Sequence, residues 1–279
     1  MNRLLLVDGS NLLFQMFFGM PSRIIGRNGK PIQGTLGFVG ALIKIVKMTS
    51  PTHILVIFDG EAHNPRTDLD PDYKANRPDY SELADEDNPF TQLPYIYAAL
   101  DRMNIPRYET VDCEADDIIA AYCHRCDADT SVTVSSFDSD LFQLVGERVR
   151  ILRYRGENSV ICDTGYVLQR LGLPPERYAD YKSLVGDTSD NIRGVTGIGP
   201  KTAAALINEY GSLEGLLAHA DEIGRPRLRA SIIAERDRIL KNASLIRLTG
   251  DRPLPLELCE LAYTYDGSTT RAVLDSIGL

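Results

Sequence analysis

Four short apolar runs, separated by longer helical patterns, constrain the fold of this chain more than any other feature of its sequence. Each run has the length of a buried strand, and together they occupy residues 4–7, 53–58, 130–135 and 149–154. Strands that alternate with helices form a mainly parallel sheet, because neighbouring parallel strands need a crossover long enough to contain a helix. We therefore predict an α/β fold with a mainly parallel central sheet flanked by helices.

Acidic residues directly follow three of these runs. Asp8 comes after the first, Asp59 after the second, and Asp138 and Asp140 just after the third. Ligands of open α/β sheets gather at the carboxyl ends of the strands. We therefore expect these four carboxylates to converge on one edge of the sheet.

A further set of carboxylates opens a predicted helix. Glu114, Asp116 and Asp117 precede an apolar pattern that continues through residues 118–121, and Glu114 and Asp117 share a helix face because they are three residues apart. Acidic residues in a first turn also interact favourably with the helix dipole, which is an alternative role. We expect one or two of the three to face the sheet edge.

Residues 186–211 combine two possible metal ligands with a Gly-rich segment that could bind a phosphate group. Asp187 and Asp190 are three residues apart and precede a predicted helix at 200–210, which Pro200 suits because the missing N–H is not needed in a first turn. Glycines leave backbone amides uncovered on the approach to this helix: Gly194, Gly197 and Gly199. A helix N-terminus with such an approach binds anions. The alternative is a Gly-rich turn between two core helices.

A long polar segment at about 64–95, interrupted by prolines and containing an acidic run at 79–87, is predicted to be a lid or flexible arch beside the carboxylate edge. Three basic side chains in it can meet phosphates, and one aromatic ring can offer a face on which a base stacks. These residues are Arg66, Lys74, Arg77 and Tyr73. The alternative is a solvated loop with incidental charges.

Composition limits the class of protein without fixing its function. The 279 residues fit one large or two modest domains, and 43% hydrophobic with 25% charged residues is typical of a soluble globular protein. The net charge of −9 argues against a simple positive coat for nucleic acid, but bound divalent cations would offset carboxylates, so DNA is not excluded. The first apolar run is too short for a signal peptide or a membrane span.

The cysteines and histidines suggest no catalytic centre of their own. The five cysteines are odd in number and irregularly spaced, which indicates free thiols of a cytosolic protein. Cys123, His124 and Cys126 resemble half of a zinc site, but no second pair stands at ligand spacing. The histidines are scattered along the sequence, at positions 53, 63, 124 and 219.

The carboxylates at strand ends and helix starts would repel one another in a shared cleft unless cations were bound. Oxygen ligands in such number fit Mg²⁺ or Mn²⁺. Two such ions about 4 Å apart clamp the attacking and leaving oxygens of an in-line displacement at phosphorus. The nine predicted ligands are Asp8, Asp59, Glu114, Asp116, Asp117, Asp138, Asp140, Asp187 and Asp190.

Six motifs in this order resemble the flap endonuclease family: VDGSN, IFDG, YKANR, CEADDIIA, SSFDSDLFQL and GDTSDNIRGVTGIGPKTAAALINEYGS. The chain is most similar to the 5′–3′ exonuclease domain at the amino end of bacterial DNA polymerase I and to its free-standing relatives, over about residues 2–260. The resemblance implies a PIN-like nuclease domain at 1–174 with its arch at 64–95. It also implies a helical region at 175–279, with a DNA-binding helix–hairpin–helix at about 186–211.

The same resemblance implies roles for individual residues. The nine carboxylates become ligands of two Mg²⁺ or Mn²⁺ ions, and Lys74 and Arg77 contact the scissile phosphate. The hairpin holds duplex DNA and binds K⁺. Further DNA contacts are expected at Arg66, Tyr73, Gly194, Gly197, Gly199, Lys201 and Thr202, and the K⁺ ligands at Ser189, Val195 and Ile198.

The implied activity is two-metal cleavage of DNA near single-strand/duplex junctions, in replication and repair. Expected substrates are 5′ flaps, nicked or gapped duplexes and RNA primer ends, acted on by a monomer in the bacterial cytoplasm at the nucleoid, with no membrane partner. A polymerase or proofreading domain does not fit in 279 residues.

Some positions depart from the family pattern. Gln15 stands where an arginine is usual, Arg193 where proline is common, and Thr196 and Ser139 where lysine is common. Residues 80–91 are longer and more acidic than the usual arch. One alternative is therefore a paralogue that binds junction DNA with weakened catalysis. Another is a phosphatase of a different α/β fold that uses Asp138 and Asp140 as nucleophile and acid.

Overall fold

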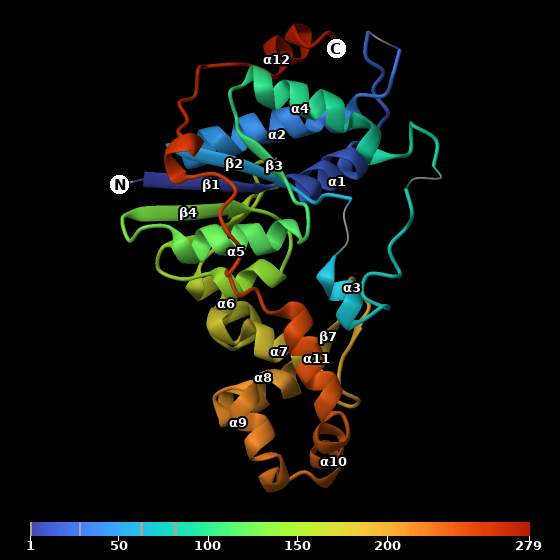
Figure 1. Ribbon diagram of the computed structural model, residues 1–279, viewed down its shortest axis with the longest axis vertical. Coiled ribbons are helices and arrows are strands. Elements are labelled where there is room, and N and C mark those ends of the chain that lie inside the picture. Colours follow the sequence, from blue (N-terminus) through green and yellow to red (C-terminus); the bar gives the residue numbers. More distant parts are fainter. Residues whose placement is uncertain (1, 28, 62–63, 81–82) are drawn as a thin grey trace.

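The computed structural model describes residues 2–27, 29–61, 64–80 and 83–279. A sheet domain carries both termini, and a smaller helical domain extends from one side of it (Figure 1). His63, and residues 81–82 of the predicted acidic run, lie outside the described residues.

The described strands form a six-stranded sheet in the order β3-β2-β1-β4-β5-β6. Neighbouring strands are parallel except for β6, which pairs antiparallel with β5. This confirms the predicted fold class. The strands are β1 (Asn2–Asp8), β2 (His53–Phe58), β3 (Arg107–Glu109), β4 (Thr130–Ser135), β5 (Val149–Arg153) and β6 (Val160–Cys162).

Two of these strands were not predicted. Both β3 and β6 are three residues long and lie at the edges of the sheet. An edge strand pairs on one side only and is half exposed, so its sequence lacks the apolar run of a central strand. The predicted strand at 149–154 is confirmed, with its end at Arg153.

Helices cover both faces of the sheet (Figure 1). Successive side chains of the central strand β1 point to opposite faces of the sheet. Leu5 and Val7 belong to the apolar core on one face, and Leu4 and Leu6 belong to the core on the other face. The first core lies under α1 (Gly9–Gly19), α2 (Gln33–Thr49), α4 (Leu93–Arg102) and α12 (Thr270–Ser276), and the second under α5 (Ala115–Arg125) and α6 (Thr164–Leu171).

The helical domain has its own apolar core. A short antiparallel pair, β7 (Gly186–Asp187) and β8 (Ile192–Arg193), lies between its first two helices. Its helices are α7 (Tyr178–Val185), α8 (Pro200–Tyr210), α9 (Leu213–Ala218), α10 (Pro226–Ala234) and α11 (Arg236–Ile246). Helices α10 and α11 are separate, because the chain leaves helical geometry at Glu235 (φ −106°, ψ 16°) and starts a new helix.

Helix α11 returns beside the predicted arch, which begins with the short helix α3 (Pro65–Leu69) (Figure 1). A small apolar cluster joins the arch to the helical domain: Tyr73, Ala179, Ile192, Leu245 and Ile246. The base of the arch is therefore packed between the two domains.

Candidate metal centre and DNA interface

The carboxyl ends of β1 and β2 carry the first two predicted ligands. Asp8 caps α1, accepting a hydrogen bond from the Asn11 amide at 3.0 Å, and its other oxygen accepts one from the Ser136 hydroxyl at 2.8 Å. Asp59 is held by the Ala115 amide, which donates to it at 2.8 Å. Burial, and then the neighbouring Asp59 charge, raise the pKa of Asp8 to about 7.

The turn after β4 carries the next pair. The Asp140 amide donates to Asp138 Oδ1 at 2.8 Å, so the turn places both carboxylates together. Asp140 also accepts from the Tyr178 hydroxyl of α7 at 3.0 Å. Burial and the Asp138 charge raise the pKa of Asp140 to about 7.

The start of α5 carries the next three predicted ligands, Glu114, Asp116 and Asp117. Glu114 and Asp117 form a reciprocal capping box. Arg66 binds Asp117 with two nitrogens, at 2.8 and 2.7 Å, and donates to Glu114 at 3.0 Å. Asp116 Oδ1 is buried and has no hydrogen-bond partner within the described residues.

Arg66 and Tyr73, two of the predicted DNA contacts, are both buried. Arg66 is only 8% exposed and also donates to the Leu245 carbonyl of α11, at 2.9 Å. Tyr73 is 6% exposed, and its hydroxyl donates to Glu114 at 3.0 Å. Neither side chain presents an open surface to a phosphate or a base, because both are enclosed by the carboxylate cluster.

The base of the arch is tied to the loop between β7 and β8 by backbone groups. The Lys74 amide donates to the Asp190 carbonyl at 3.0 Å, Asn76 donates to the Thr188 carbonyl at 3.0 Å, and Asn191 donates to a carbonyl of the arch at 2.7 Å. Lys74 adopts a left-handed backbone conformation (φ 57°), which is uncommon outside glycine. This docking fixes where the Lys74 side chain points.

Lys74 and Arg77, predicted to contact the scissile phosphate, lie against carboxylates. The Lys74 amine pairs with Glu114 and is 3.9 Å from Asp190, and Arg77 is 2.8 Å from Asp190. Although burial opposes the charged form of Lys74, the Glu114 and Asp190 carboxylates raise its pKa. Both side chains are positively charged groups at the carboxylate edge.

The sequence analysis missed a further basic residue of the site. Lys182 of α7 pairs with Asp187 and lies 3.9 Å from Asp140 Oδ1, so it links the two domains. Burial works against its charge, but the two carboxylates raise its pKa above the ordinary value. Its place five residues before Asp187 in the sequence was the available signal.

The donor chemistry of this cluster fits a hard divalent cation. All the predicted ligands are carboxylates, several are buried with raised pKa values, and one buried oxygen, Asp116 Oδ1, lacks a hydrogen-bond partner within the described residues. In the described part of the chain, no group of three or more acidic, histidine or cysteine side chains is placed so that it could hold a metal ion without rearrangement. Lys74 and Lys182 stand among them and supply positive charge.

The hairpin before α8 needs glycine for close backbone packing. A Cβ on Gly194 would lie 2.1 Å from the Val185 carbonyl oxygen, whereas one on Gly199 would meet open space. Gly197 adopts φ +81°, a conformation that favours glycine. The Gly199 carbonyl accepts the first intrahelical bond, from Ala203, so the amides before Ala203 have no intrahelical partner.

The remaining predicted hairpin residues lie on both sides of this turn. Lys201 is exposed and Thr202 is half-buried at the start of α8. Ser189 donates to Asp187, whereas Val195 and Ile198 are buried. The Val195 carbonyl accepts the Ile198 amide at 3.1 Å.

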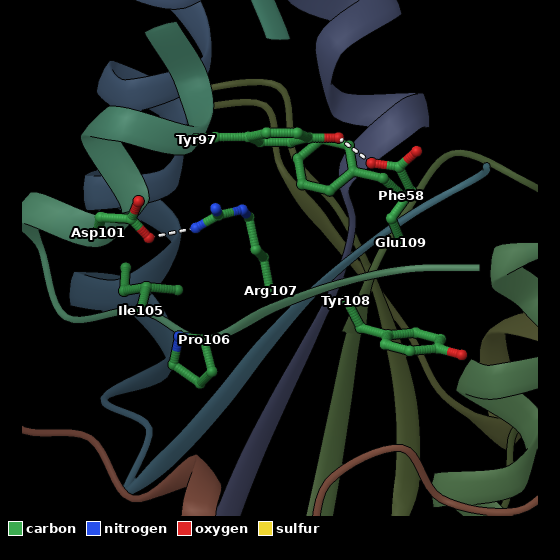
Figure 2. A pocket seen from close by; sticks show the side chains of 8 residues that line it. All are labelled: Phe58, Tyr97, Asp101, Ile105, Pro106, Arg107, Tyr108 and Glu109. Atoms are coloured by element: carbon green, nitrogen blue, oxygen red, sulfur yellow. Dashed lines mark hydrogen bonds and ion pairs between the residues drawn. The ribbon is translucent and has the colours of Figure 1, made fainter. Parts of the chain in front are cut away.

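A cavity of about 370 Å³ lies beside the edge strand β3 (Figure 2). Four of its polar side chains are paired with one another. Arg107 pairs with Asp101 and stacks on Tyr97 at 4.7 Å, and Tyr97 donates to Glu109 at 2.8 Å. No predicted site residue lines this cavity.

Comparison with known families identifies the family to which the chain belongs. A model of the 5′–3′ exonuclease N-terminal, resolvase-like domain matches residues 3–172, and one of the 5′–3′ exonuclease C-terminal SAM fold matches residues 173–267. The chain belongs to the 5′–3′ exonuclease family. This confirms the predicted enzyme class, a 5′–3′ exonuclease, and removes the phosphatase alternative.

Relatives of known sequence are bacterial DNA polymerases. DNA polymerase I of Rhizobium leguminosarum is 38% identical over 266 residues, which cover 92% of this chain and 25% of that protein. The thermostable DNA polymerase I of Thermus aquaticus is 34% identical over 259 residues, covering 92% of this chain and 30% of that protein. The chain therefore spans between a quarter and a third of the length of these relatives.

Solved structures show the same fold. A bacteriophage T5 flap endonuclease, in a complex with DNA and metal ions, superposes with a TM-score of 0.71 and 25% identity, covering 88% of this chain and 89% of that one. The catalytic core of Rad2 with a DNA substrate has a TM-score of 0.61 and 18% identity, covering 99% of this chain and 86% of that one, which supports the fold alone. No helix in the described ranges has the length and apolar character needed to cross a bilayer.

Proposed function

We propose that this 5′ nuclease cleaves DNA beside single-strand/duplex junctions, at 5′ flaps, nicks or gaps, with RNA primer ends as a further substrate. One observation carries the proposal. Carboxylates from four separate segments meet at one edge, and the arch base docks Lys74 and Arg77 on the loop that opens the Gly-rich hairpin. A metal-ligand set, phosphate-binding cations and a duplex-binding hairpin are thus adjacent.

The nine predicted carboxylates would hold two Mg²⁺ or Mn²⁺ ions, with Asp117 committed mainly to Arg66. When bound, such ions lower the pKa of a water that attacks phosphorus and stabilise the departing 3′ oxygen. Lys74 and Arg77 would bind the non-bridging oxygens of the scissile phosphate, exchanging the carboxylates that they contact for the substrate. Gly194, Gly197 and Gly199, with Lys201 and Thr202, would hold the duplex phosphates, and a K⁺ ion would lie near Ser189, Val195 and Ile198.

The test is cleavage of a fluorescently labelled 5′ flap substrate in Mg²⁺, in Mn²⁺ and in EDTA, with binding measured in parallel. We expect metal-dependent cutting close to the junction. We also expect the protein to act as a monomer in the bacterial cytoplasm. Cutting that persists in EDTA would overturn the two-metal proposal.

A second function is binding of junction DNA with little cleavage. One observation favours it: Gln15 of α1 is neutral, and its amide donates to the Tyr154 carbonyl at 2.7 Å. Tight binding without cutting in either metal would support this function and reject the first.

A further inference from the structure

The basic side chains of the carboxylate edge are almost all paired with carboxylates. Arg66 binds Asp117, and Lys74, Arg77 and Lys182 each contact an acidic group of the cluster. A cation in an ion pair has to release its carboxylate before it can bind a substrate phosphate. A basic group at the same edge without an acidic partner would be free to bind one directly.

Arg155 is such a group. It is exposed, and its guanidinium forms no ion pair with any described residue. It lies instead over the ring of Phe137, 5.0 Å from the ring centroid. Arg153 flanks the same ring at 5.9 Å and donates to the Phe137 carbonyl at 2.8 Å. Both guanidinium groups thus lie near this ring, and the contact with it orients the Arg155 side chain.

The fold places Arg155 beside the predicted metal ligands. Strand β5 runs parallel to β4, so the carboxyl ends of both strands lie at the same edge. Phe137 directly precedes Asp138, and its amide donates to Asn11 of α1 at 3.0 Å. The hydrogen bond from Gln15 to the Tyr154 carbonyl ties the end of β5 to α1 as well.

The backbone at Arg155 is anchored. The Arg155 amide donates to the Ser159 hydroxyl at 2.9 Å, and its carbonyl accepts the Asn158 amide at 3.1 Å. Gln15 in α1 and Ser139 in the turn after β4 are neutral, and the nearby Arg153 is half-buried and donates to the Phe137 carbonyl. Arg155 is thus the exposed cation here, with an anchored backbone and no ion pair to a described residue.

We propose that Arg155 binds a phosphate of the DNA strand that is cut, adjacent to the scissile phosphate, and that Phe137 and Arg153 position it. A guanidinium binds phosphate through two parallel hydrogen bonds, and stacking on a ring leaves its edge free to do so. This inference rests on the proposed function and adds a substrate contact that lies outside the arch and the hairpin.

The test compares Arg155→Ala and Arg155→Lys with wild type in binding of a 5′ flap substrate in EDTA, over a range of salt concentrations. Arg150→Ala is the matched control, because Arg150 is exposed on β5, five residues before Arg155 and roughly 16 Å from it at about 3.3 Å per residue of extended chain. Arg155→Ala should weaken binding about tenfold at low salt. It should also reduce the slope of log K against log[salt] by about 0.9, the share of one phosphate contact.

Arg155→Lys should restore the slope but not the full affinity, because lysine keeps the charge without the two-pronged geometry. A substrate with one uncharged methylphosphonate next to the scissile phosphate should abolish the difference between wild type and Arg155→Ala. A wild-type slope in Arg155→Ala, or equal losses in Arg155→Ala and Arg150→Ala, would overturn the inference. Wild-type binding without cutting in Mg²⁺ would instead overturn the proposed function, and the binding comparison would still decide the role of Arg155.

Discussion

The sequence and the structure give Arg66, at the start of the arch, different roles. The sequence predicts a DNA contact, whereas the structure shows a buried guanidinium that binds Asp117 twice, Glu114 once and the Leu245 carbonyl of α11. Removing one partner of a buried ion pair costs about 3–5 kcal/mol, because the remaining charges are left uncompensated. For Arg66→Ala we therefore expect a loss of stability of this size.

The loss is large enough to measure by thermal unfolding. At about 2–4 °C per kcal/mol for domains of this size, Arg66→Ala should lower the Tm by about 6–20 °C. Arg77→Ala is the matched control, because its side chain is 55% exposed and an exposed ion pair contributes about 0–1 kcal/mol. The double variant Arg66→Ala, Asp117→Asn should lose less than the sum of the two single losses, because both remove the same pair.

One outcome for Arg66→Ala would refute this reasoning. If Arg66→Ala unfolds at the wild-type temperature but binds flap DNA more weakly, Arg66 contacts DNA as the sequence suggested. The buried ion-pair network would then not describe the protein in solution. Arg66→Lys should fall between wild type and alanine in Tm, because lysine keeps the charge but cannot bind Asp117 with two nitrogens.

Three other variants test separate parts of the site. Asp140→Asn should abolish cleavage while junction binding remains measurable, because it removes a ligand charge and little shape; retained cleavage would remove Asp140 from the ligand set. Lys74→Ala should slow cleavage about 100-fold or more and change duplex binding much less, and a larger effect on binding would make Lys74 a phosphate anchor only. Gly194→Ala should lower the Tm, because its Cβ would lie 2.1 Å from the Val185 carbonyl, while Gly199→Ala should leave the Tm almost unchanged; equal effects would show that the hairpin tolerates a side chain at both positions.

Local patterns were enough to predict most of the sheet domain. The run from Leu4 to Val7 predicts β1 because all four side chains are buried, and Asp8 follows at the end that faces the site. Strand β3 escaped prediction because only three residues pair, at the sheet edge.

The sequence by itself determined that this chain is an α/β nuclease with acidic strand ends and a Gly-rich hairpin. Those features depend on residue type and short spacing, which set burial, strand direction and backbone freedom. Only the tertiary structure determined which basic side chains form ion pairs and which have no acidic partner among the described residues. Arg66 meets Leu245 across 179 residues, and Gln15 meets Tyr154 across 139. Such partners are chosen by how distant elements pack, so the burial of Tyr73, the entry of Lys182 into the site and the unpaired state of Arg155 became visible only in the fold.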